Sequence, residues 1–280
     1  MVDFSSVGGV SPSQSRQNIE RSSARLQTAI ASLVSGERIN RAADDVASLS
    51  IATQLQSEVS GLKTASGNIA QASSQVQVAD SGAEQIGRAL DRLNELAVQA
   101  NSSVINDESR AALDQEAQSL IAEIDRLAEG TTFNGNALLN GDVSGDNALS
   151  ITQLLGAPEL GDDDALAIDS LTTEALFDGQ SINLQSQESA AQAASVISAA
   201  LDRATGTRAA LGAFERSLNF AAANIDSAIA NQEAARSVLQ DTDFGEASTE
   251  LSVANIQRNA SIAIQAQGNN LAPNLLRLIG

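Results

Sequence analysis

Residues 62–97 read LKTASGNIAQASSQVQVADSGAEQIGRALDRLNELA, and their apolar residues recur in alternating steps of three and four. That spacing places them along one side of a helix, in the heptad pattern of coiled coils. A stripe of about five heptads indicates a helix that packs along its length against other helices. Its members are Leu62, Ala65, Ile69, Ala72, Val76, Ala79, Ala83, Ile86, Leu90, Leu93 and Ala97.

Two further stripes have related spacing. One contains Leu113, Ala117, Leu120, Ile124 and Leu127, and the other contains Ile197, Ala200, Ala204, Leu211, Phe214, Leu218, Ala221, Ile225 and Ala228. Periodicity and capping signals together predict helices over residues 12–35, 46–100, 107–130, 188–240 and 246–267. We expect Gly268-Asn269-Asn270 to interrupt the last helix before a short apolar tail.

The two ends of the chain share one plan, in which a terminal helix, a polar break and a long helix follow one another. Asp44, Asp45, Asp241 and Asp243 lie in the breaks, where carboxylates cap helix starts. Helices so far apart in sequence can pair only if the chain folds back. The sequence therefore predicts a mainly α fold, a long antiparallel coiled-coil helical rod with its N- and C-termini together.

The central region has a different pattern, which predicts a small β-hairpin region. Asn134-Gly135 and Asn140-Gly141 are dipeptides typical of hairpin turns. Residues 149–152 and 166–169 alternate as short strands do, and residues 172–176 suit a short helical turn.

Composition excludes several functions. The formal net charge of −19 disfavours nucleic acid and anionic membranes as partners. The chain contains no histidine and no cysteine, which removes the usual general base, metal ligand and nucleophile pairs. We expect no enzyme activity and no cofactor, and the acidic run at 162–164 is interpreted as a solvated surface. We expect no membrane span and no cleavable signal. Any export would therefore use a route that needs no cleaved signal.

The terminal helices carry apolar stripes that a thin pair of helices covers only in part. An intramolecular coiled coil is the simpler interpretation of the heptads, but stripes left exposed favour partner subunits. The candidate polymerisation residues are Ile19, Leu26, Ile30, Leu33, Leu271, Leu275, Leu276 and Leu278. We expect segments 1–42 and 243–280 to become ordered on assembly.

Several strings, in this order, resemble bacterial flagellin over about residues 5–140 and 185–280. The strings are Ser35-Gly36-Glu37-Arg38-Ile39-Asn40, Ala43-Asp44-Asp45, Asn94-Glu95-Leu96-Ala97-Val98-Gln99-Ala100, Thr132-Phe133-Asn134-Gly135, Asp241-Thr242-Asp243-Phe244, Gln265-Ala266-Gln267 and Pro273-Asn274-Leu275-Leu276. The resemblance implies a structural protein that self-assembles into the helical flagellar filament used for motility. It also implies an extracellular location, reached through the flagellar export channel without a cleaved signal.

The resemblance further implies a division of the chain. Residues 1–42 with 243–280 would form the inner filament tube, and residues 43–140 with 186–242 the outer tube. Residues 141–185 would be a short variable hairpin and loop region. The implied partners are other copies of the chain, the hook–filament junction protein, the filament cap, a secretion chaperone and the export apparatus.

One string matches the motif that many flagellins present to an animal Toll-like receptor. The matching residues are Leu90, Arg92, Glu95, Leu96 and Gln99, with Glu116 where a further contact carboxylate is expected. The same residues suit packing between subunits, and we expect an outward Arg92 to find partners only on other molecules. Asp91 and Asn94 depart from the commoner pattern of this motif.

Two other functions remain open at this point. A hook–filament junction protein shares the terminal helices but does not form the filament, and matching motifs at both ends favour the filament subunit. An adhesin or other coiled-coil binding module is the third interpretation.

Overall fold

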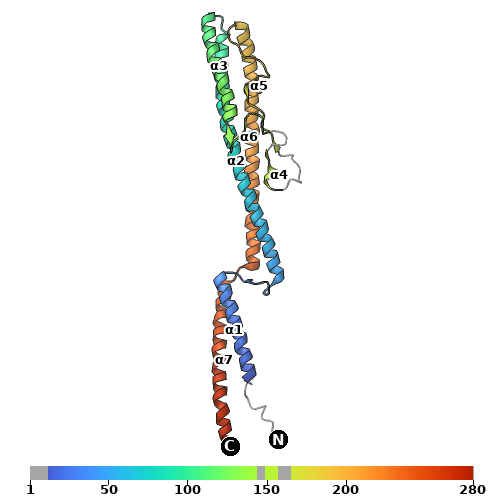
Figure 1. The fold of residues 1–280 in the computed structure, drawn as a ribbon, viewed down its shortest axis with the longest axis vertical. Helices are drawn as coiled ribbons and strands as arrows, with labels where there is room; N and C mark the ends of the chain where they lie inside the picture. The colour runs from blue at the N-terminus through green and yellow to red at the C-terminus, as the bar shows by residue number, and fades with distance from the viewer. Residues whose placement is uncertain (1–11, 144–148, 157–164, 280) are drawn as a thin grey trace. The chain divides into compact units, whose positions relative to one another are not determined.

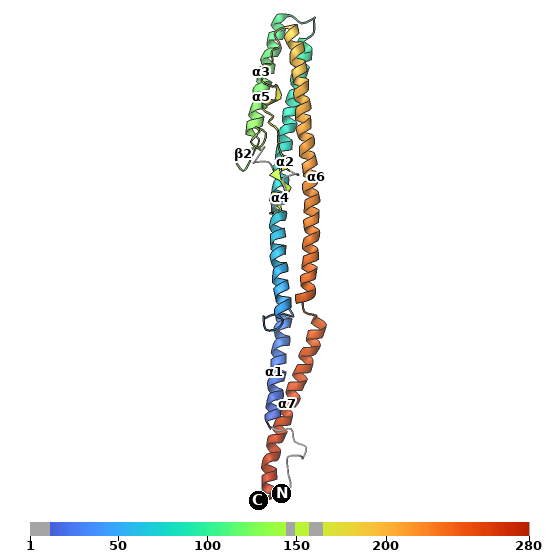
Figure 2. The same cartoon turned by 90° about the vertical axis from the view of Figure 1, so that its right-hand side faces the viewer.

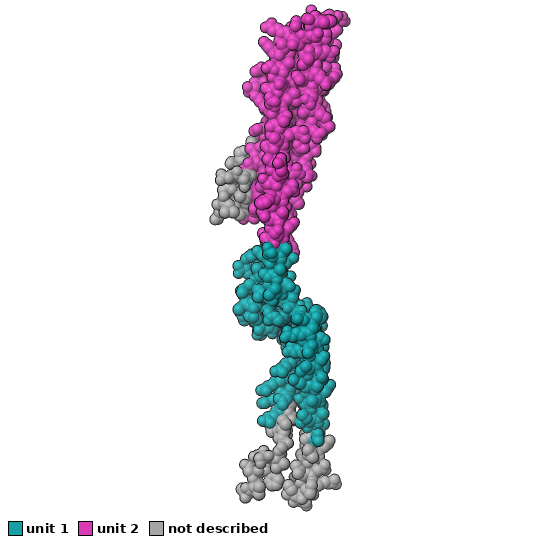
Figure 3. Space-filling model, turned by 180° about the vertical axis from the view of Figure 1, so that it is seen from behind, with its two compact units in different colours: residues 1–59, 230–280 teal, residues 60–229 magenta. Residues whose placement is uncertain are grey.

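The computed structural model describes residues 12–143, 149–156 and 165–279, with residues 12, 13, 15, 152 and 268–279 described by their backbone alone. The chain divides into one unit of residues 60–229 and another that joins residues 1–59 to residues 230–280 (Figure 3). The acidic run at 162–164 lies outside the described residues.

Three long helices supply most of the larger unit, which takes residues 60–100 of the first and 187–229 of the last. α2 (Val46–Ala100) and α6 (Gln187–Gln240) lie side by side in opposite directions, and α3 (Asp107–Gly130) folds back beside them (Figures 1 and 2). Within this unit the arrangement is antiparallel and mainly α, as predicted. The bounds of all three helices agree with those expected from periodicity to within a residue.

The heptad stripes form the core of this unit. Every residue of the 62–97 stripe is buried except Leu62, which is partly buried. Ile197, Ala200, Leu211 and Leu218 bury the facing side of α6. Because the seam alternates alanine with larger aliphatic residues, the helices approach closely and exclude water, and Phe214 is the aromatic residue that the α6 stripe contributes.

Polar contacts flank this seam between α2 and α6. Arg208 Nε donates to Asp80 Oδ1 at 3.0 Å, and Gln77 Nε2 donates to Glu215 Oε1 at 3.0 Å. The hydrogen bond to Asp80 raises the pKa of Arg208 above its ordinary value. These exposed pairs contribute little free energy but favour one register of the two helices.

Capping residues set where the helices begin. Asp45 Oδ1 accepts the backbone N–H groups of Ala47 and Ser48 at 3.0 and 3.1 Å, which confirms the predicted cap of α2. Asn106 caps α3 by accepting the N–H of Ser109 at 2.9 Å.

Two of the predicted caps act differently from expectation. Asp44 accepts the N–H groups of Asn40 and Arg41, so it stabilises the loop before α2 rather than the helix start. Asp241 accepts the hydroxyl of Ser237 at 2.5 Å. The reason is position, since Asp44 and Asp241 each lie too early to reach the N–H groups of the next helix.

Two short antiparallel strand pairs lie in the centre. β1 (Thr132–Phe133) pairs with β2 (Asn136–Ala137) through an Asn134-Gly135 turn, as predicted. β3 (Leu149–Ser150) pairs with β4 (Ala165–Leu166). The short helix expected near 172–176 is present as α5 (Thr173–Leu176).

The remaining central predictions were wrong in detail. Ile151 and Thr152 begin α4 (Ile151–Leu154) instead of extending a strand, and residues 167–169 lie beyond β4. Asn140-Gly141 does not join two strands but lies in a bend, with Gly141 at φ 95°. Local alternation failed here because hydrogen bonds distant in sequence hold the backbone, with the N–H of Ile168 donating to Val143 O and that of Leu171 to Leu139 O, both at 2.8 Å.

Side chains of α3 and α6 form hydrogen bonds with residues 173–184 of the central region. Asp114 of α3 accepts the N–H of Leu184 at 2.9 Å, and Asp125 accepts the N–H and hydroxyl of Thr173, both at 2.8 Å. Arg203 of α6 donates to the carbonyls of Ala175 and Leu176, at 2.7 and 2.9 Å. These bonds satisfy backbone groups that a strand ladder would otherwise pair.

The smaller unit contains α1 (Pro12–Ser35) and α7 (Phe244–Ile279), which run antiparallel side by side (Figures 1 and 2). This pairing brings residues 12 and 279 toward the same end of the unit, as predicted. α7 is not interrupted at Gly268-Asn269-Asn270, so that prediction was wrong. Glycine and asparagine lower helix propensity without forbidding a helix.

The two breaks in the chain meet within this unit. The N–H of Arg38 donates to Gln240 O and its Nη2 donates to Leu239 O, both at 2.6 Å. The N–H of Thr242 donates to Gly36 O at 2.9 Å. Gly36 ends α1 at φ 74°, a conformation that glycine adopts without steric cost.

Candidate assembly surfaces

The receptor-like motif on α2 has an inner and an outer side. Leu90 and Leu96 are buried in the core, at 0% and 1% exposure. Arg92 and Glu95 are exposed, and so is Gln99. The six predicted residues therefore do not form one surface: two support the helix and the others face solvent.

Arg92 has partners within its own chain, contrary to expectation. Its Nη1 donates to Glu95 Oε2 at 2.9 Å, and its Nη2 and Nε donate to Glu116 Oε1 at 2.9 and 3.2 Å. The expectation failed because α3 folds back beside α2 and places Glu116 against the outer face.

These contacts determine the electrostatics of the cluster of Arg92, Glu95 and Glu116. The hydrogen bond that Arg92 donates to Glu116, followed by the one it donates to Glu95, raises the pKa of Arg92 above its ordinary value. Arg92 side-chain exposure is 51%, so solvent screens the ion pairs. The cluster is therefore an exposed group of ion pairs that contributes little to stability.

The terminal helices meet through small residues that the sequence analysis missed. Ala29 and Ser22 of α1 are buried, as are Ala247 and Ala254 of α7. The available signal was the seven-residue spacing of these small residues, from 22 to 29 and from 247 to 254. Small seams allow close helix approach but bury little apolar area.

Larger apolar side chains of these helices remain exposed. Of the predicted polymerisation residues in α1, Ile30 is 44% exposed. The others in that helix are partly buried, namely Ile19, Leu26 and Leu33. The structure does not describe the side chains of the four in α7, which are Leu271, Leu275, Leu276 and Leu278. The other exposed members are Val34, Phe244, Val253, Ile256, Ile262 and Ile264. Apolar surface of this extent on two thin helices indicates an interaction surface.

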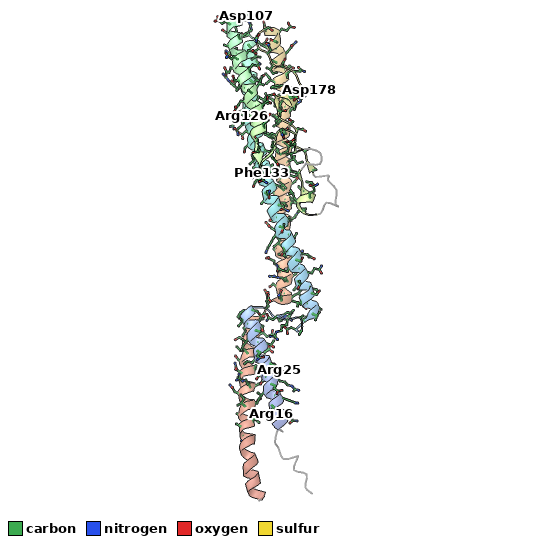
Figure 4. All side chains as sticks on the ribbon, viewed as in Figure 1. Arg16, Arg25, Asp107, Arg126, Phe133 and Asp178 are labelled. Atoms are coloured by element: carbon green, nitrogen blue, oxygen red, sulfur yellow. The ribbon has the colours of Figure 1, made fainter. Side chains whose placement is uncertain are left out.

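The basic side chains of α1 border this surface. Arg16 and Arg25 both extend from α1 (Figure 4), and Arg25 lines a groove of about 500 Å³ with Glu246, Glu250 and Val253 of α7. The lining of the groove thus combines charged residues of both helices with the apolar side chains of Val253 and Ala254.

Among the described residues, no group of three His, Cys, Asp or Glu side chains is placed to hold a metal ion. None of the helices in the described part of the chain has the length and apolar character to cross a membrane. The fold defines a mainly α protein whose terminal helices leave large apolar side chains exposed.

Comparisons with known proteins match this class. Residues 10–144 match the bacterial flagellin N-terminal helical region, and residues 194–279 match the bacterial flagellin C-terminal helical region. The chain belongs to the bacterial flagellins, the structural subunits of flagellar filaments.

Individual relatives align over most of their length. The flagellar filament 30.7 kDa core protein of Treponema maltophilum is 30% identical over 263 residues, covering 91% of this chain and 92% of the relative. A flagellin of Halalkalibacterium halodurans is 31% identical over 254 residues, covering 90% and 91%. A crystal structure of Bacillus cereus flagellin aligns at 25% identity and a TM-score of 0.48, covering 57% of this chain and 88% of that one.

Proposed function

We propose that this chain polymerises into the flagellar filament through the exposed apolar faces of α1 and α7. The observation that supports this is the exposure of Val34, Phe244 and Ile256, at 83%, 61% and 68%. Covering such side chains with helices of other copies removes apolar area from water, which drives association. The names of the relatives, which are filament core proteins, favour this role over that of a hook–filament junction protein.

The proposed role of each segment of the chain follows from the family resemblance. Residues 1–42 with 243–280 form the inner tube, residues 43–140 with 186–242 form the outer tube, and residues 141–185 form the small variable region. The subunit acts outside the cell as a structural protein without enzyme activity. It leaves through the flagellar export apparatus with a secretion chaperone, and it meets the junction protein and the filament cap at the filament ends.

The cluster of Arg92, Glu95 and Glu116 is proposed as the contact for an animal Toll-like receptor. Gln99 extends this surface along α2, whereas Leu90 and Leu96 act from the core by holding the helix in place. The observation that supports it is the ion-paired arrangement, which presents the guanidinium and both carboxylates in one orientation. Charged surfaces of this kind contribute specificity and association rate.

A pair of substitutions at Ile256 tests polymerisation. Ile256→Asp places a charge in the proposed interface and is expected to abolish filament growth from seeds, whereas Ile256→Leu keeps the apolar face and is expected to retain it. Electron microscopy and sedimentation measure the filament yield. Thermal melts serve as the control, since an exposed position leaves the monomer's melting temperature nearly unchanged. Normal filament yield from Ile256→Asp would contradict the proposal.

A further inference from the structure

The chain contains two Asn-Gly dipeptides, at 134–135 and 140–141, whose surroundings differ. Asn-Gly is the dipeptide most open to attack by the glycine backbone nitrogen on the asparagine side-chain carbonyl, because glycine has no side chain to block the approach. The reaction also needs a free asparagine side chain and a backbone that can move. The structure allows these requirements to be compared at the two sites.

Asn134-Gly135 is unconfined. The two residues form the turn between β1 and β2 at φ 51° and 86°, and both are exposed. A Cβ added to Gly135 would meet nothing within 4 Å. Among the described residues, neither the Asn134 side chain nor the Gly135 N–H has a hydrogen-bond partner. The preceding residue, Phe133, ends a strand of only two residues (Figure 4).

Asn140-Gly141 is held on both sides. Asn140 Nδ2 donates to Asp142 Oδ2 at 2.6 Å, and its Oδ1 accepts the N–H of Asp142 at 3.0 Å. A Cβ on Gly141 would lie 3.2 Å from Ser170 Cβ. The flanking backbone is also tied, since the N–H of Leu171 donates to Leu139 O at 2.8 Å.

We propose that Asn134 is a site of spontaneous deamidation in the folded protein and that Asp142 protects Asn140 from the same reaction. At Asn134 the backbone nitrogen of Gly135 bonds to the side-chain carbonyl carbon, and the amide nitrogen leaves as ammonia, taking up the proton that the backbone nitrogen loses. Water then opens the resulting succinimide at either carbonyl. The products are aspartate or isoaspartate, and no electron transfer is involved.

The modification changes the hairpin tip in two ways. Either product adds one negative charge to a chain whose net charge is already −19. Isoaspartate also inserts the side-chain methylene into the main chain. A two-residue turn cannot accommodate the longer main chain. The pairing between Phe133 and Asn136 therefore opens in that product.

The test follows both sites in the full chain at mildly alkaline pH. Proteolytic cleavage after Leu139 separates the two sites. Mass spectrometry of the fragments then measures how much of each asparagine side-chain amide has become a carboxylic acid. In the folded protein we expect Asn134 to deamidate several-fold faster than Asn140. In urea the two rates should converge, because the local sequence is Asn-Gly at both sites.

The variant Asp142→Ala provides the matched comparison. It removes the carboxylate that accepts from Asn140 Nδ2, whereas the backbone N–H of residue 142 remains. Deamidation at Asn140 is expected to accelerate, while that at Asn134 stays unchanged. Three outcomes would overturn the proposal: an Asn140 rate equal to or above that of Asn134 in the folded chain, an Asn134 that reacts only in urea, or no response of Asn140 to Asp142→Ala.

Discussion

Leu90 and Arg92 are separated by one residue on α2 and have opposite surroundings. Leu90 is 0% exposed within the heptad seam, as the spacing with Ile69 and Val76 predicted. Arg92 is outward, as predicted, but its partners could not be predicted from the sequence of α2. They depend on the way α3 returns, and nothing in the local pattern specifies that Glu116 will lie opposite Arg92.

Substitutions at these two residues should therefore separate stability from recognition. Leu90→Ala leaves a cavity in the seam and is expected to cost about 2–5 kcal/mol. Arg92→Ala removes only screened surface pairs, so the monomer's melting temperature should change little, while binding to the Toll-like receptor ectodomain should weaken. Thermal melts and binding isotherms measure the two effects. If Arg92→Ala melted as early as Leu90→Ala, the assignment of inner and outer faces would be wrong.

The Asp45 cap should make part of the protein's stability depend on acid pH. The side-chain hydrogen bond from Ser48, with the N–H groups of Ser48 and Ala47, lowers the pKa of Asp45 below its ordinary value of 3.8. Because the pKa of Asp45 is lower in the folded state, its stabilising contribution is fully present at pH values above the ordinary aspartate pKa. The contribution is lost as the pH falls through the folded-state pKa.

Asp45→Asn isolates this contribution, because asparagine keeps the cap without titrating. The difference in melting temperature between the two proteins should shrink as the pH falls from neutral to below the ordinary aspartate value. Other carboxylates titrate in both proteins and cancel in the comparison. A difference independent of pH would show that the charge of Asp45 makes no contribution.

At the scale of the elements, helices could be predicted from sequence and the short central elements could not. The helices at 46–100 and 107–130 follow from long periodic stripes and capping residues, which act locally. α4, the bend at Asn140 and the segment after β4 depend instead on contacts distant in sequence. Asn68 of α2 donates to Leu154 O, and the N–H of Leu171 donates to Leu139 O. The α1–α7 seam was missed for a different reason, since alanine and serine carry a weak hydrophobic signal.

The packing of α2 against the segment after α3 gives a test at this scale. A Cβ on Gly82 would lie 2.5 Å from Thr131 Oγ1 and 2.8 Å from Leu139 Cδ1, whereas a Cβ on Gly87 would meet nothing within 4 Å. Gly82→Ala is therefore expected to destabilise the protein by about 1–3 kcal/mol. Gly87→Ala, in the same helix, should be neutral or stabilise by up to about 1 kcal/mol. Urea unfolding measures both, and equal effects would contradict this packing.

At the scale of the whole molecule, the two units differ in how much of their apolar surface a single chain buries. The unit of residues 60–229 has a continuous buried core along α2, α3 and α6. The described part of α1 and α7 buries mainly small residues and leaves Val34, Ile256 and Ile264 exposed. Ordering the backbone costs about 1–2 kcal/mol per residue, which so thin a seam offsets poorly without other copies.

Hydrogen exchange compared between dilute monomer and sedimented filament tests the central claim most directly. The claim is that other copies of the chain cover the exposed faces of α1 and α7. We predict that amides in residues 19–33 and 247–264 exchange rapidly in the monomer and become strongly protected in the filament. Amides in residues 86–97 should be protected in both states. Strong protection of 19–33 and 247–264 in the dilute monomer, or no gain in the sedimented polymer, would contradict the claim.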